Sequence, residues 1–188
     1  MRSGAEVDYA DAHDTNADDA RLVKAAVCAG FYPQVLRVDN PMPTFSKTHG
    51  GAFESDSKGV PKVFERTQGR VFMHPTSVNM AANKFETGWL VYTDMVKTSK
   101  VFVRASSMAP MYALLLFGAP PVVKHEEGLI TVDDWVALKA PAKVGVLVRE
   151  LRKLLDDVLC AKLEDPSKDV SQEPVLRGIL ELLRTDGL

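Results

Sequence analysis

The sequence predicts a mainly β protein, a small antiparallel β-barrel with a short helix inserted between its strands and amphipathic helices at its C-terminal end. Three observations support this fold class. Residues 32–140 contain short runs of β-branched and aromatic residues, prolines and glycines separate these runs, and the strongest helical periodicity begins only after Pro141. The 188 residues, 46% hydrophobic and 26% charged, are enough for one domain with appendages.

Two stretches precede the predicted strands. Residues 1–17 are rich in Asp, Ala, Ser and Gly, a composition that predicts a disordered acidic tail. Asp18 or Asp19 can then cap a short helix, which we expect Gly30 to end in the left-handed conformation. The helix would bury an apolar stripe made of Leu22, Val23, Ala26 and Val27.

The β region contains eight predicted strands and one helix. Residues 111–117 are introduced by Pro110 and closed by Gly118, which predicts the short inserted helix. Curled antiparallel strands with one inserted helix are the outline of the oligonucleotide/oligosaccharide-binding (OB) fold, although strand count alone indicates only a small barrel. The strands are expected at residues 34–38, 62–67, 70–74, 89–96, 100–105, 122–125, 129–132 and 135–139.

Two amphipathic helices are predicted after the β region. Apolar residues between Val144 and Leu159 recur at helical spacing with charged residues opposite them. We therefore divide the chain into a barrel (31–140), a helix packed on the barrel (141–165), and a linker with a terminal helix (166–188). The terminal helix carries an apolar stripe with little barrel left to cover, formed by Val175, Ile179, Leu182 and Leu183.

Charge is distributed unevenly along the chain. Residues 1–20 contain six acidic side chains and one arginine, whereas residues 57–104 contain eight basic and three acidic side chains. The formal net charge is −2, which argues against strong nonspecific nucleic-acid binding by the whole chain. The basic middle segment nevertheless favours local contact with phosphates.

Several functional classes are excluded by missing motifs. The sequence has no G-x-x-x-x-G-K-[ST], G-x-S-x-G or H-E-x-x-H, its four histidines are scattered, and Cys28 and Cys160 stand far apart. We expect no catalytic centre, metal or cofactor in this chain, and a hydrolase built on His74 and Ser77 would lack an acidic orienter. No apolar run can span a bilayer, so no membrane partner is expected, and the cysteine usage fits the cytosol or nucleus.

Candidate binding residues lie in the basic middle segment. Lys97, Thr98, Ser99 and Lys100 join two predicted strands, with Arg104 further along, and such groups commonly donate to phosphate oxygens. A solvated hairpin tip is the alternative. His74 and Ser77 either satisfy the backbone of a turn or contact a nucleic-acid strand.

Four aromatic side chains are candidate stacking platforms for bases, of the kind that single-strand binders use. The alternative is that they belong to the core, which their alternation with valines favours. They are Trp89, Tyr92, Phe102 and Trp135.

Several of these segments also resemble a known family. From about residue 20 to about residue 165 the sequence closely resembles the C-terminal OB-fold region of DEAH-box (DEAH/RHA) RNA helicases. The segments that carry the resemblance are residues 21–33, 71–79 (VFMHPTSVN), 89–92, 96–104 (VKTSKVFVR) and 112–118, continued by 134–136 and 147–152.

The resemblance implies an RNA-binding module of an ATP-dependent helicase. The ATP and Mg²⁺ of such a helicase belong to its RecA-like domains, whose motifs are absent from this sequence, and residues 18–30 would be the end of the helical domain that precedes the OB-fold. The implied partners are single-stranded RNA, the RecA-like domains or an activator protein, in the nucleus or cytoplasm. The implied RNA-contacting residues are Lys97, Thr98, Ser99, Lys100 and Arg104, then His74, Ser77 and Arg70, and more weakly the 39–59 loop with Lys47, His49 and Lys58.

A second hypothesis, from a different class, is a protein-docking module that binds a helicase core or an activator without contacting RNA. The apolar stripe of the terminal helix motivates it.

Overall fold

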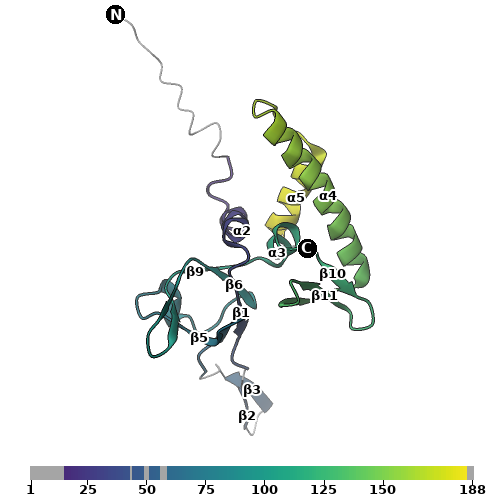
Figure 1. Ribbon diagram of the computed structural model, residues 1–188. Coiled ribbons are helices and arrows are strands. Elements are labelled where there is room, and N and C mark those ends of the chain that lie inside the picture. Colours follow the sequence, from purple (N-terminus) through teal and green to yellow (C-terminus); the bar gives the residue numbers. More distant parts are fainter. Residues whose placement is uncertain (1–14, 43, 49–50, 56–58, 186–188) are drawn as a thin grey trace, which may run out of the picture.

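The computed structural model describes residues 15–42, 44–48, 51–55 and 59–185 (Figure 1). Its helices are α2 (Ala20–Phe31), α3 (Met111–Phe117), α4 (Ala142–Glu164) and α5 (Pro174–Thr185), with a 3₁₀ turn η1 (Val78–Ala81). Of the expected disordered tail, residues 1–14 lie outside the described residues, and residues 15–18 form a turn. His49 and Lys58 of the 39–59 loop also lie outside them.

The OB-fold part is a curled, mixed, seven-stranded sheet that forms a half-barrel. Its strand order is β7-β8-β5-β4-β1-β6-β9, and every neighbouring pair is antiparallel except β5 and β8, which are parallel. A separate hairpin pairs β2 (Thr44–Thr48) with β3 (Gly51–Ser55). The sheet consists of β1 (Val35–Asp39), β4 (Lys62–Glu65), β5 (Gly69–Met73), β6 (Trp89–Tyr92), β7 (Met95–Lys97), β8 (Val101–Val103) and β9 (Ser106–Met108).

Sequence patterning located most of this sheet and missed part of it. The single strand expected at residues 89–96 is two strands, β6 and β7, because the chain turns at Thr93 and Asp94 between them. Strand β9 was not predicted, since Ser-Ser-Met has none of the β-branched residues that mark a strand. The β2–β3 hairpin was missed as well.

The three strands that follow form a smaller antiparallel sheet of their own. Its order is β10-β11-β12, and the turn before β12 contains Asp133 and Asp134, both at positive φ (55° and 54°). The strands are β10 (Val122–Lys124), β11 (Leu129–Val132) and β12 (Val136–Lys139). The last three predicted strands therefore lie beside the half-barrel rather than in it (Figure 1).

Helix α4 covers one face of this smaller sheet. The helix contacts β10 and β11 as well as α3 and α5, and its buried residues are Gly145, Val148 and Leu155. A Cβ atom on Gly145 would lie 2.4 Å from Cγ2 of Val123 and 3.2 Å from Cδ1 of Ile130. The absence of a side chain at Gly145 thus allows the helix to approach the sheet closely.

Helices α2 and α5 meet at their ends. Asp19 caps α2 as expected, by accepting from the backbone N–H groups of Arg21 and Leu22, and it also pairs with Arg184 of α5 at 3.1 Å. The prediction for Gly30 was wrong: α2 continues to Phe31, and Gly30 is not among the described residues at positive φ. No helix in the described part of the chain is both long and apolar enough to cross a membrane.

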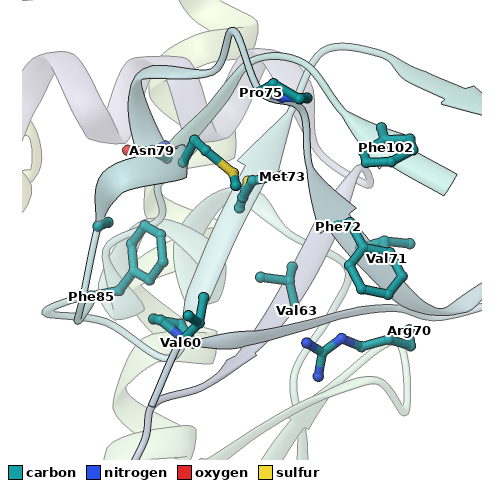
Figure 2. Close-up of a pocket in the computed structure, with 13 residues that line it drawn as sticks. Val60, Val63, Arg70, Val71, Phe72, Met73, Pro75, Asn79, Phe85 and Phe102 are labelled. Carbon is teal, nitrogen blue, oxygen red and sulfur yellow. The ribbon is translucent and has the colours of Figure 1, made fainter. Parts of the chain in front are cut away.

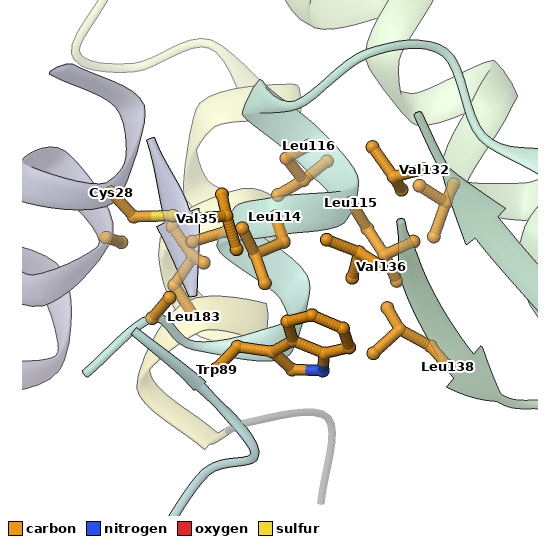
Figure 3. Packing of buried hydrophobic residues seen from close by; sticks show 14 of the residues in the cluster. Cys28, Val35, Trp89, Leu114, Leu115, Leu116, Val132, Val136, Leu138 and Leu183 are labelled. Carbon is orange, nitrogen blue, oxygen red and sulfur yellow. The ribbon is translucent and has the colours of Figure 1, made fainter. Parts of the chain in front are cut away.

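Two hydrophobic cores result from this arrangement. The smaller one fills the curled sheet and contains Leu36, Val63, Val71, Leu90 and Val103, all at most 3% exposed. The larger one joins α2 and α3 to the smaller sheet, α4 and α5. Figure 3 shows the leucines of α3, Leu114 to Leu116, between Cys28 and Val35 on one side and the strand residues Val132 and Val136 on the other.

Candidate nucleic-acid interface

The parallel pairing of β5 with β8 places two similar sequence segments side by side. Phe72 is paired with Phe102, and Met73 with Val103. Because side chains alternate along a strand, residues 70, 72 and 74 share one face with residues 100, 102 and 104, while Val71 and Val103 point into the smaller core. We call the six side chains Arg70, Phe72, His74, Lys100, Phe102 and Arg104 the aromatic–cationic platform.

Ring contacts hold the platform together. The rings of Phe72 and Phe102 lie 6.1 Å apart, centroid to centroid, at 48°, and the imidazole of His74 meets the Phe102 ring edge-on at 6.1 Å. The guanidinium carbon of Arg70 lies 5.3 Å and Nζ of Lys100 lies 4.5 Å from the centre of the Phe72 ring. Both phenylalanines are only half-buried, so their rings are accessible beside these cations.

The same pattern continues across β4 and β1. Arg37, Phe64 and Arg70 are register partners on three neighbouring strands. The guanidinium carbons of Arg37 and Arg70 lie 4.9 Å and 5.6 Å from the Phe64 ring centre, and Arg37 also lies 5.8 Å from the Trp135 ring. A row of alternating rings and cations therefore runs from the smaller sheet to the platform.

Sequence reasoning missed Arg37, Phe64 and Phe72. The repeated spacing of Arg70-Val-Phe72 and Lys100-Val-Phe102 was the available signal for Phe72. Arg37 and Phe64 gave no local signal, because only the strand register brings them beside Arg70.

The predicted hairpin residues are divided between two faces. Lys97 pairs with Val101, one residue out of phase with Lys100, so it lies on the opposite face from the platform. Thr98 donates its backbone N–H and its hydroxyl to the carbonyl of Lys100, at 2.8 Å and 3.4 Å, and Ser99 lies exposed at the tip. Of the four hairpin residues, the structure brings only Lys100 to Arg70 and Phe72.

His74 has the turn role considered for it, and its ring also lies in the platform. Its Nδ1 accepts from the backbone N–H of Thr76 at 3.2 Å and lies 2.7 Å from the Thr76 hydroxyl, which is the local turn interaction. Its ring nevertheless belongs to the platform through Phe102. Ser77 donates its backbone N–H to the carbonyl of His74 at 2.8 Å and precedes η1 without a capping side-chain hydrogen bond.

The other aromatic candidates have different environments. Trp89 is 8% exposed and meets Trp135 edge-on, with ring centroids 6.3 Å apart. Trp89 is therefore a core residue and not an exposed stacking platform. Trp135 is half-buried and donates its indole N–H to the carbonyl of Val35 at 3.3 Å. Tyr92 packs against the smaller core, and burial together with nearby Glu65 raises the pKa of its hydroxyl.

Acidic groups near the platform are held by local hydrogen bonds or by weak, exposed ion pairs. Burial alone would raise the pKa of Glu65, but donation from the backbone of Gln68 and from the hydroxyl and backbone of Thr67 lowers it overall. Asp94 lies 3.8 Å from Arg104, and Asp39 lies 3.2 Å from Arg37; all four side chains are at least 44% exposed, so these pairs are weak. Neither Arg70 nor Lys100 forms an ion pair with any residue that the structure describes.

The described residues contain no grouping of three or more His, Cys, Asp or Glu side chains that could hold a metal ion. Cys28 is fully buried, and burial raises the pKa of its thiol to about 12, so it is neutral at physiological pH. The arrangement offers rings and cations on a sheet face, which suits binding rather than bond chemistry.

Comparison with known proteins divides the chain as the structure does. A family model described as the oligonucleotide/oligosaccharide-binding (OB)-fold matches residues 23–120, and one described as the C-terminal domain in RNA helicases matches residues 128–185. The first covers the half-barrel with α3, and the second covers most of the smaller sheet with α4 and α5. The OB-fold predicted from the sequence is confirmed.

Individual relatives agree with these families. They include the ATP-dependent RNA helicase dhx29 of Xenopus laevis, 36% identical over 171 residues, and the ATP-dependent DNA/RNA helicase DHX36 of Homo sapiens, 31% identical over 181 residues. A putative DEAH-box ATP-dependent helicase of Mycosarcoma maydis is 33% identical over 198 residues. The alignments cover 91%, 90% and 94% of this chain, which spans only 12%, 16% and 12% of the length of these relatives.

Proposed function

The chain belongs to the family of C-terminal OB-fold regions of DEAH-box RNA helicases, and on this premise we propose that its aromatic–cationic platform binds single-stranded RNA for an ATP-dependent helicase. The observation that carries this proposal is the pair of half-buried rings, Phe72 and Phe102, flanked by Arg70 and Lys100 on an uncovered sheet face. Proteins that bind single strands without sequence preference combine aromatic stacking surfaces with cations that follow the backbone.

The electrostatics of the platform support an anionic ligand. Arg70 and Lys100 contact rings and have no carboxylate partner among the described residues, and Arg104 is held only by an exposed pair with Asp94. A phosphate that binds here would therefore break no ion pair of Arg70 or Lys100, and only the exposed pair of Arg104. Three phosphate contacts give single-strand binding a salt slope of about −2, with a dissociation constant on the order of 10⁻⁴ to 10⁻⁶ M for the isolated chain.

In this proposal the chain holds RNA, and other domains of the helicase hydrolyse ATP. Its protein partners would be RecA-like domains or an activator, and its location would be the nucleus or the cytoplasm, wherever the helicase acts. ATP and Mg²⁺ would bind to those other domains.

The first test compares two lysines of one hairpin. Lys100 lies over the Phe72 ring, whereas Lys97 lies on the opposite face, so Lys100→Ala and Lys97→Ala remove the same charge from the same exposed hairpin. We expect Lys100→Ala to weaken binding of labelled oligouridine roughly fivefold, as for one charge-assisted contact of about 1 kcal/mol. Its salt slope should fall by about 0.7, whereas Lys97→Ala should produce a much smaller loss. Fluorescence anisotropy at two salt concentrations measures both quantities.

Two outcomes would contradict the proposal. If the wild-type chain does not bind oligouridine, single-strand binding is refuted. Equal effects of the two alanine variants would show that total charge matters and that the platform does not.

The structure removes the reason for the alternative hypothesis of a protein-docking module. The apolar stripe of the terminal helix is covered within the chain, since Ile179 is 3% and Leu183 is 6% exposed in the larger core. Capture of helicase domains by a chain that binds no RNA would restore that alternative.

A further inference from the structure

A second feature of the same region is an apolar cavity of about 170 Å³ beside the platform. It lies next to β5 and beneath the segment that contains η1, and its lining is mainly hydrocarbon (Figure 2). Two platform residues, Phe72 and Phe102, line part of its wall, and Arg70 also lines it. The cavity and the platform therefore share three residues.

The cavity has a buried floor and an exposed apolar mouth. Val63, Val71 and Phe85, at most 5% exposed, close it against the smaller core. Val60 and Met80 also line it, although they are 74% and 50% exposed. Figure 2 shows Phe85 on one side of the cavity and Phe72 with Phe102 on the other. A ligand that enters here would cover the exposed hydrocarbon of Val60 and Met80.

We propose that this cavity receives one unstacked base of a single-stranded nucleic acid whose phosphates are held by Arg70 and Lys100. The inference rests on the proposed function and adds a base site to it. The observation that selects this occupant is the juxtaposition of an apolar cavity that has one cation, Arg70, in its lining with a second cation, Lys100, that lies over the ring of the lining residue Phe72.

The size of the cavity fits a single aromatic ring. An apolar protein cavity of about 150 Å³ is known to accept benzene, so 170 Å³ accommodates a six-membered pyrimidine ring. A paired base in a duplex enters less readily, because its extrusion costs free energy that a base already in a single strand largely avoids. The site therefore favours single strands over duplexes, and pyrimidines over the larger purines.

These two cations distinguish a nucleotide from an apolar protein side chain. Arg70 lines the cavity, and so does Phe72. Nζ of Lys100 lies 4.5 Å from the centre of the Phe72 ring. A nucleotide carries a phosphate close to its base and so uses both features at once. An isolated leucine or phenylalanine side chain would use only the cavity.

The test fills the cavity and asks whether the loss depends on bases. Val60→Phe at the mouth and Ala82→Leu in the wall would occupy the space, and Val78→Phe is the matched control, because Val78 is 95% exposed and does not line the cavity. Each full-length variant is titrated with labelled oligouridine and with an abasic strand of equal length. Because a stacked base contributes about 1–3 kcal/mol, we expect the two filling variants to lose about fivefold or more in affinity for oligouridine. Their affinity for the abasic strand should be unchanged.

The outcomes separate this inference from the proposed function. If the wild-type chain binds oligouridine but the filling variants match Val78→Phe, no base occupies the cavity, and the platform alone binds the strand. An equal loss for the abasic strand would also overturn the base site, since it would mean that backbone contacts had changed. Failure of the wild-type chain to bind any single strand would overturn the proposed function itself, and the base site with it.

Discussion

The half-barrel and the smaller sheet are built from similar strands and differ in what lies on their outer faces. In the smaller sheet, Ile130, Val132, Val136 and Leu138 are at most 5% exposed in the core that the helices close. On the half-barrel, Phe64, Phe72 and Phe102 stay half-buried with Arg37, Arg70 and Lys100 against their rings. Aliphatic residues thus mark a face that the chain covers itself, and rings with cations mark a face that it leaves open.

The largest expected effect concerns the covered face. Gly145→Ala would place a Cβ atom 2.4 Å from Val123 and force α4 away from the smaller sheet, so we expect it to lower the free energy of unfolding by about 1–3 kcal/mol. Gly178→Ala is the control, because a Cβ atom there meets nothing within 4 Å and should raise helix stability by about 0.5–1 kcal/mol. Urea denaturation measures both variants, and equal signs would show that α4 does not pack as closely as described.

The next effect concerns the open face. The double variant Phe72→Leu with Phe102→Leu keeps apolar bulk while removing both rings, so oligouridine affinity should fall about tenfold with little change in folding, as expected when stacking worth about 1–3 kcal/mol per base is lost. Phe117→Leu changes a half-buried phenylalanine that packs against the larger core and should leave affinity unchanged. If Phe117→Leu weakened binding equally, the contrast between the two faces would not hold.

The smallest effect tests a contact between the two regions. Tyr32, which follows α2, donates its hydroxyl to Asp133 of the smaller sheet. Burial first, and this hydrogen bond second, raise the pKa of Tyr32 to about 12 from its usual value of 10.

A raised folded-state pKa means that folding favours the neutral hydroxyl over the phenolate. This contribution is complete below pH 10 and is lost as pH rises toward 12. Tyr32→Phe should therefore be less stable than wild type at neutral pH, and the difference should shrink between pH 10 and pH 12. Urea midpoints measured across that range check this, and a difference that does not change with pH would contradict it.

The sequence was sufficient for elements with a strong local pattern. The inserted helix at Met111–Phe117 and the strand at Leu129–Val132 were predicted with the bounds that the structure shows. The helix cap was narrowed to Asp18 or Asp19, of which the structure shows Asp19, because a capping side chain acts within three residues of its own position. Strand β9 was not, because its placement depends on pairing with β6 and not on its own residues.

The candidate site was predictable only in part, for a similar reason. Arg70, His74, Lys100 and Arg104 were named from the basic segment and the family resemblance, and the structure brings them together. The parallel register that joins them was not foreseen, and so neither Phe64 nor Arg37 was recognised. Lys97 and Lys100 look equivalent in the sequence, and only the pairing with Val101 separates them.

The parallel pairing of β5 with β8 has one more consequence. An antiparallel pair is related by a two-fold rotation, so a repeated motif on it would look alike from either end. The pair formed here is related by translation, with Arg70 and Lys100 together at one end and His74 and Arg104 together at the other. The platform therefore has polarity, a property that it shares with the single strand proposed as its ligand, whose 5′ and 3′ ends differ.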